Sequence, residues 1–142
     1  MKRLLLVALL LVGCAGAPAV AEPTAIPEPT ATLTCAEASA DYRAAVDGIL
    51  TTWDDANAVA GSTARISLSG PVQDLQAIAR DVDALDPPPY ADKAHSLLTD
   101  YMRRVIDGYL SFMAQEANAE NKLNQANNIL QQWAEEYATL TE

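Results

Sequence analysis

Residues 123–140 read LNQANNILQQWAEEYATL and carry the clearest periodicity in the chain. Apolar residues recur there at steps of three and four, which is the spacing of one face of an α-helix. The members of this stripe are Leu123, Ala126, Leu130, Trp133, Tyr137 and Leu140. The pattern therefore predicts a C-terminal amphipathic helix whose apolar side packs against other helices.

Three stretches upstream show the same helical spacing. The first begins at the capping box of residues 34–37 and ends near Gly61, the second begins at Pro71 with Ser69 or Gly70 as its cap, and the third begins near Tyr90. Residues 61–70 are expected to form a loop, and Pro87-Pro88-Pro89 to end the second helix. The predicted apolar stripes are Tyr42, Val46, Ile49, Trp53, Ala56 and Ala60; Val72, Leu75, Ile78, Ala79, Val82 and Leu85; and Ala94, Leu97, Leu98, Tyr101, Val105, Tyr109 and Phe112.

The junction between the last two helices allows two interpretations. Neither Gly nor Pro occurs after Gly108, so residues 90–140 could form one helix of about fifty residues, roughly 75 Å long. Half of such a long stripe would lack a partner in a small core. We therefore place a break near Asn118, where polar residues cluster and an Asn side chain could cap the next helix. Gly108 itself is expected to weaken its helix by about 1 kcal/mol relative to Ala.

Together these segments predict an all-α fold. Residues 35–142 are expected to form a three- or four-helix up-down bundle, because the helices are amphipathic and their connections are short. The 142-residue chain carries 9 basic and 19 acidic residues, a formal charge of -10. That balance argues against a nucleic-acid partner, which would require clustered Lys and Arg. Two Cys and one His exclude a disulfide-rich scaffold and a multi-His metal centre.

The N-terminal segment has the order of an export signal. A basic start at Lys2-Arg3 precedes nine apolar residues, which are too few to span a bilayer. The run ends in Leu11-Val12-Gly13-Cys14, which resembles the lipobox of bacterial lipoproteins. The resemblance implies that residues 1–13 are a signal peptide and that Cys14 carries acyl chains such as palmitate. It also implies anchoring on the extracytoplasmic side of the cell membrane or of the outer membrane.

Residues 15–34 separate that Cys from the predicted bundle. The stretch is dominated by Ala, Pro and Thr and contains four prolines, so we expect residues 14–34 to form a lipidated, disordered tether. A proline-rich tether followed by helices resembles small extracytoplasmic helical-bundle lipoproteins. That resemblance covers the Pro87-Pro88-Pro89 turn and the residues 94–98, Ala-His-Ser-Leu-Leu, and it implies no biochemical activity.

Few residues remain as candidates for chemistry. If Cys14 is lipidated, Cys35 is an odd thiol in an exported protein, which points either to a small packed residue or to an intermolecular disulfide in a homodimer. Asp92 and His95 lie three apart on one helical face and are weak metal candidates, since a single His cannot build a di-iron or haem site. We expect no metal and no cofactor.

The predicted last helix also has an amide-rich face. Neutral amides can hydrogen-bond a glycan or a partner helix, although a solvated helix face can also use them in place of charges. The residues of this face are Asn121, Asn124, Gln125, Asn128, Gln131 and Gln132. No nucleophile, phosphate loop or paired acid and base accompanies them, so we expect a non-enzymatic binding or scaffolding module for an envelope protein or glycan. The alternative is a small-ligand or metal carrier with a site inside the bundle.

Overall fold

The computed structural model describes residues 35–140, with side chains from Ser39 onward. It contains four α-helices, α1 (Cys35–Ser62), α2 (Ser69–Asp83), α3 (Asp92–Met113) and α4 (Ala119–Thr139), together with the 3-10 turns η1 (Arg65–Ser67) and η2 (Pro89–Ala91). No strand occurs among residues 35–140. The predicted all-α fold is therefore confirmed. The predicted signal peptide, Cys14 and the proline-rich tether lie outside the described residues.

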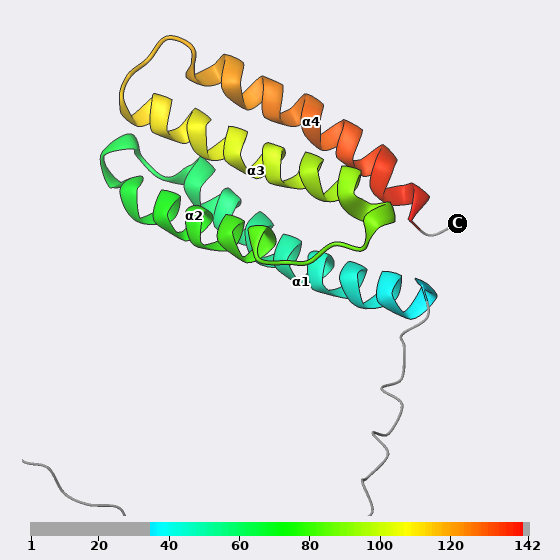
Figure 1. The fold of residues 1–142 in the computed structure, drawn as a ribbon. Helices are drawn as coiled ribbons and strands as arrows, with labels where there is room; N and C mark the ends of the chain where they lie inside the picture. The colour runs from blue at the N-terminus through cyan, green and yellow to red at the C-terminus, as the bar shows by residue number, and fades with distance from the viewer. Residues whose placement is uncertain (1–34, 141–142) are drawn as a thin grey trace, which may run out of the picture. The chain divides into compact units, whose positions relative to one another are not determined.

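The four helices run alternately in opposite directions, as an up-down bundle requires (Figure 1). α3 lies between α2 and α4 and packs along both of them, whereas α1 packs chiefly along α2. The α1–α2 and α3–α4 turns lie at one end of the bundle, and the proline-rich α2–α3 connection lies at the other. Within residues 35–140, no helix combines the length and apolarity that a membrane crossing requires.

The start of α2 differs from the prediction. The helix begins at Ser69 rather than Pro71, and η1 occupies part of the segment expected to be a loop. Neither Ser69 nor Gly70 is the cap, because the N-cap position belongs to Leu68, which makes no side-chain capping bond. Leu68 is fully buried, and its carbonyl accepts a hydrogen bond from the Val72 amide at 3.0 Å. Burial of this leucine starts the helix early, which local capping rules do not anticipate.

The break between α3 and α4 is confirmed, and the alternative of a single long helix is wrong. α3 ends in a Schellman turn, in which the Glu116 amide donates to the Ser111 carbonyl at 2.9 Å and the Gln115 amide to the Phe112 carbonyl at 3.1 Å. Gln115 takes φ of 59°, a left-handed conformation that usually belongs to glycine. Asn118 occupies the N-cap position of α4, but its side chain makes no capping hydrogen bond.

The side chains of Ser111, Glu116 and Lys122 form a hydrogen-bonded network at the turn between α3 and α4. Ser111 is the one buried polar residue in the described core, and its hydroxyl donates to Glu116 Oε2 at 2.7 Å. Lys122 Nζ donates to the same hydroxyl at 2.6 Å and lies 3.7 Å from Glu116 Oε2. Each polar group of this small network therefore has a partner, as buried polar atoms require.

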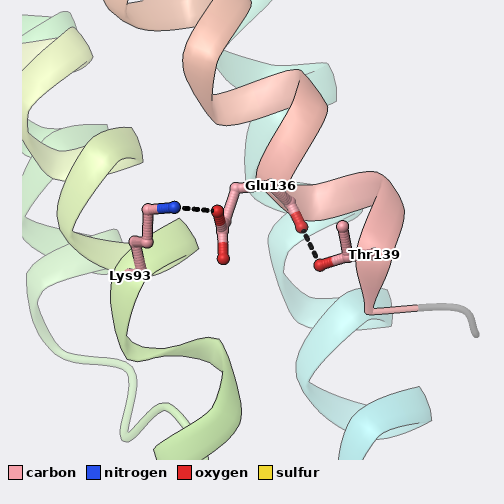
Figure 2. Close-up of polar contacts among 3 residues, drawn as sticks. All are labelled: Lys93, Glu136 and Thr139. Carbon is pink, nitrogen blue, oxygen red and sulfur yellow. Dashed lines mark hydrogen bonds and ion pairs between the residues drawn. The ribbon is translucent and has the colours of Figure 1, made fainter.

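At the opposite end of the same helix pair, an exposed ion pair joins Lys93 at the start of α3 to Glu136 near the end of α4 (Figure 2). Thr139 Oγ1 donates to the Glu136 carbonyl at 2.7 Å and closes the last turn of α4. Because the Lys93 side chain is largely exposed, this pair contributes at most about 1 kcal/mol.

Most of the predicted stripes form the core, with two informative departures. Trp53, Leu75 and Leu98 are fully buried as expected. Phe112 was expected inside but is 46% exposed, and Met102 was not expected in the core but is fully buried. Met102 is buried because α3 has neighbours on two sides, so its buried surface is wider than one stripe. α4 has the cleaner stripe, yet only Ala126 and Tyr137 of that stripe are buried.

Candidate functional site

The predicted amide face of α4 is exposed along its whole length. All six of its residues, Asn121, Asn124, Gln125, Asn128, Gln131 and Gln132, are exposed. Two of them donate a side-chain hydrogen bond within the helix: Gln125 Nε2 to Asn121 Oδ1, and Gln132 Nε2 to the Asn128 carbonyl at 3.4 Å. The side chains of Asn124 and Gln131 make no hydrogen bond within residues 35–140. The face is therefore a solvated row of donors and acceptors that a partner can reach.

The polar neighbour of His95 in the structure is a tyrosine of another helix. Its Nδ1 lies 3.3 Å from the Tyr42 hydroxyl, and the two rings are tilted with centroids 6.2 Å apart. Burial, and secondarily the charge of Asp92, raise the pKa of Tyr42 to about 12. Asp92 itself is exposed at the start of α3. His95 thus joins α3 to α1, and no group of three metal-ligating side chains gathers around it or elsewhere in the described part.

The side chains of both cysteines lie outside the part of the chain that the structure describes. Cys35 is the first residue of α1, and its side chain lies outside the described set. Cys14 lies outside the described residues altogether. Lipidation of Cys14 and an intermolecular disulfide through Cys35 therefore stay predictions.

A hollow of about 250 Å³ lies between α3 and α4 and has mixed charge. Asp100, Asp107, Arg103 and Arg104 line it together with Ile129. Arg103 also reaches Asp83 of α2, with Nη2 3.1 and 3.3 Å from the two carboxylate oxygens. Because acids and bases alternate here, the hollow has no strong preference for either sign of ligand charge.

Two larger hollows lie beside α1, one against α2 and the other against the segment that connects α2 to α3, and sequence reasoning missed both. The first, of about 440 Å³, has Asp55 and Val59 of α1 on one side and Asp74 of α2 on the other. We call it the Asp55–Asp74 hollow. It is open to the surface, and its lining is mainly apolar.

The second of these, the Asp41–Asp86 hollow, has a volume of about 530 Å³. It has Asp41 and Tyr42 of α1 on one side and Leu85, Asp86 and residues 87–89 on the other. Each hollow therefore combines an apolar floor with one carboxylate from either side. The only sequence signal for this arrangement is the recurrence of Asp at helical spacing on α1, which by itself also fits a solvated face.

No protein-family model, no curated protein and no solved structure matches this chain.

Proposed function

We propose that the protein is a membrane-anchored extracytoplasmic lipoprotein that acts as a non-enzymatic binding or scaffolding module. Cys14 would carry the acyl chains, residues 15–34 would set the distance from the membrane, and the bundle would present its surface to an envelope protein or glycan. The lipobox resemblance at residues 11–14 supports the anchor. The proline-rich composition of residues 15–34, together with the helical bundle over residues 35–140, supports the division into tether and bundle.

The observation that carries the binding role is the exposed amide face of α4. Amides lose less on transfer from water than charges do and can bond to either donors or acceptors, which suits a glycan or a polar helix. Packing of α4 on α3 turns this face outward. The three hollows described above are open to the surface, so none of them is the internal site that a ligand or metal carrier would require.

The anchor is tested by metabolic labelling with an alkyne analogue of palmitate. The wild-type chain should incorporate the label, and Cys14→Ala should abolish incorporation. Cys35→Ser is the matched control, since it removes the other thiol and should leave labelling unchanged. Label that persists in Cys14→Ala contradicts the anchor. Non-reducing electrophoresis of the same samples also tests the homodimer, which Cys35→Ser should convert to monomer.

The binding role is tested in living cells with a photo-crosslinking amino acid. Placed at Asn128, in the middle of the amide face, it should give a discrete adduct of higher mass. Placed at Ser96, an exposed residue of α3, it should not. Equal adduct patterns at the two positions would rule out the amide face as the partner surface.

A further inference from the structure

We propose that the outer face of the α1–α2 pair is a second docking surface, which binds a basic amphipathic helix of a partner protein. The apolar stripe of that helix would fill the Asp41–Asp86 and Asp55–Asp74 hollows, and its Lys and Arg side chains would pair with the carboxylates at their edges. This surface is separate from the amide face of α4 and does not depend on the lipid anchor.

The two hollows follow one another along α1, the first against the segment just after α2 and the second against α2 itself. On α1, Asp41, Gly48 and Asp55 are spaced by seven residues, about two helical turns, and so lie on one face. Because α1 and α2 are antiparallel, the start of α1 lies beside the end of α2 and the end of α1 beside its start. From Asp41 to Val59 this face is about 27 Å long, which is the length of a helix of about eighteen residues.

The shape of this face suits a helix. Each hollow has an apolar floor, and Val59 beside one of them is 55% exposed. Gly48 is exposed on α1 between the two hollows, and a Cβ atom built there meets no other atom within 4 Å. The space between two antiparallel helices accepts a third by ridge-into-groove packing, with one apolar side chain entering every three or four residues.

The charge of the face selects a basic partner. Asp41 and Asp86 flank one hollow, Asp55 and Asp74 flank the other, and no Lys or Arg lines either. Within residues 35–140, none of these four carboxylates forms an ion pair or a side-chain hydrogen bond.

The two cations of the helix pair do not neutralise them. Arg43, the only basic residue of α1, lies over the Tyr137 ring at 4.7 Å, on the side that faces α4. Arg80, the only basic residue of α2, lines neither hollow. Complementary charge therefore favours a helix with Lys and Arg beside its apolar stripe over a neutral or acidic one.

The test uses the full-length chain, held on a sensor surface in nonionic detergent with the signal of detergent alone subtracted. The ligand is a synthetic peptide of Leu and Lys, about eighteen residues long, with Leu at the spacing of one helix face. A scrambled peptide of the same composition is the control. The ordered peptide should bind several-fold more tightly than the scrambled one, and added salt should weaken its binding.

Three variants locate the binding. Asp55→Asn with Asp74→Asn should weaken peptide binding by roughly fivefold, because two exposed charge pairs are lost. Glu120→Gln with Glu135→Gln removes the same charge from exposed positions of α4 and should leave the dissociation constant unchanged. Gly48→Trp should abolish binding by filling the space between the hollows, whereas Gly48→Ala should retain it. Circular dichroism confirms that each variant is folded.

Each contrary result has a definite meaning. Equal binding of ordered and scrambled peptides overturns the proposal, and so does an equal loss in the α4 control variant. If the chain instead forms a dimer that Gly48→Trp dissociates, as measured by light scattering, the face is a contact between copies and the proposal is wrong. None of these outcomes alters palmitate labelling or crosslinking at Asn128, so the function proposed above stands or fails separately.

Discussion

α3 and α4 approach each other closely, whereas α1 is joined to them through large aromatic side chains. Between α3 and α4, a Cβ atom on Gly108 would lie 2.5 Å from Leu123 Cδ2 and 2.7 Å from Leu123 Cγ, so the Leu123 side chain would have to move to admit it. Between α1 and its partners, Trp53 Nε1 donates to the Tyr101 hydroxyl at 3.2 Å. The Tyr137 hydroxyl donates to Asp47 Oδ1 at 2.9 Å.

The difference shows two ways in which a small bundle holds its helices. The α3–α4 contact depends on the absence of a side chain and on shape, so an added atom forces the packed Leu123 side chain to shift. The α1 contacts depend on ring area together with a hydrogen bond at the end of each ring, so they tolerate a larger distance between helices. Tyr109 repeats the second arrangement, since its hydroxyl donates to Asn57 Oδ1 at 3.0 Å. Truncation should therefore harm the α1 contacts, and enlargement should harm the α3–α4 contact.

The largest effect should come from Trp53→Ala. Trp53 is fully buried and packs edge-on against Tyr101, with ring centroids 5.8 Å apart. Its removal leaves a cavity and a tyrosine hydroxyl without its donor, which should cost about 3–5 kcal/mol of the free energy of unfolding. Urea unfolding followed by circular dichroism measures the change. A loss below about 1 kcal/mol would show that α1 is not held by this ring.

Gly108→Ala should have the next largest effect, because it adds an atom to a packed contact where Trp53→Ala removes a side chain. Ala favours a helix over Gly by about 1 kcal/mol, but the collision with Leu123 should outweigh this and give a net loss of about 1–3 kcal/mol. Gly48→Ala is the matched substitution in α1, where nothing lies within 4 Å of the new atom. It should raise stability by roughly 0.5–1 kcal/mol. Thermal melts that move in the same direction for both variants would contradict the comparison.

Alkaline pH should weaken the aromatic contacts of α1 selectively. Burial is the first cause that raises the pKa of Tyr42, to about 12, and it also raises the pKa values of Tyr101, Tyr109 and Tyr137. Between the ordinary tyrosine pKa of about 10 and these raised values, the unfolded chain has lost protons that the folded chain keeps.

The free energy of unfolding should therefore be unaffected by these groups below pH 10 and should fall as pH rises from about 10 toward 12. Urea midpoints across this range measure the fall. Tyr42→Phe should make the fall less steep, and an unchanged slope in this variant would exclude Tyr42 as a contributor.

A small effect should follow a change at the turn between α3 and α4. The left-handed backbone of Gln115 costs free energy because its Cβ is crowded in that conformation, whereas Gly adopts the conformation freely. Gln115→Gly should therefore raise the free energy of unfolding by about 1 kcal/mol. Gln115→Ala keeps the strain and should bring no such gain. Urea midpoints of the two variants distinguish relief of backbone strain from loss of the Gln side chain.

Much of the fold could be predicted from residue spacing. The stripes of α1 and α2 predicted which side of each helix is buried, because a helix of fixed pitch brings residues three and four apart together. The polar cluster near Asn118 predicted the last turn, although the Schellman turn at Gln115 has no signature in the sequence, since it uses a residue other than glycine. The stripe of α3 predicted too narrow a buried face, because periodicity gives a direction but not the number of neighbours.

The sequence predicted one candidate surface, the amide face, but not the hollows, because periodicity describes a single helix and not its neighbours. The amide face of α4 could be identified because positions off the apolar stripe of a single helix point to solvent. The hollows beside α1 could not, because Asp41 and Asp86 or Asp55 and Asp74 are brought together only when segments far apart in the sequence pack. His95 was predicted beside Asp92, its neighbour on α3, but contacts Tyr42 from another helix.

The sequence by itself determined that residues 35–140 form amphipathic helices with an acidic outer surface, because helix pitch, prolines and charge act over a few neighbouring residues. Only the tertiary structure decided that Gly108 lies against the Leu123 side chain, that aromatic rings join α1 to α3 and α4, and that four carboxylates flank apolar hollows on one face. Those properties depend on distances between helices. Such distances follow from how all the side chains of the core fill space together.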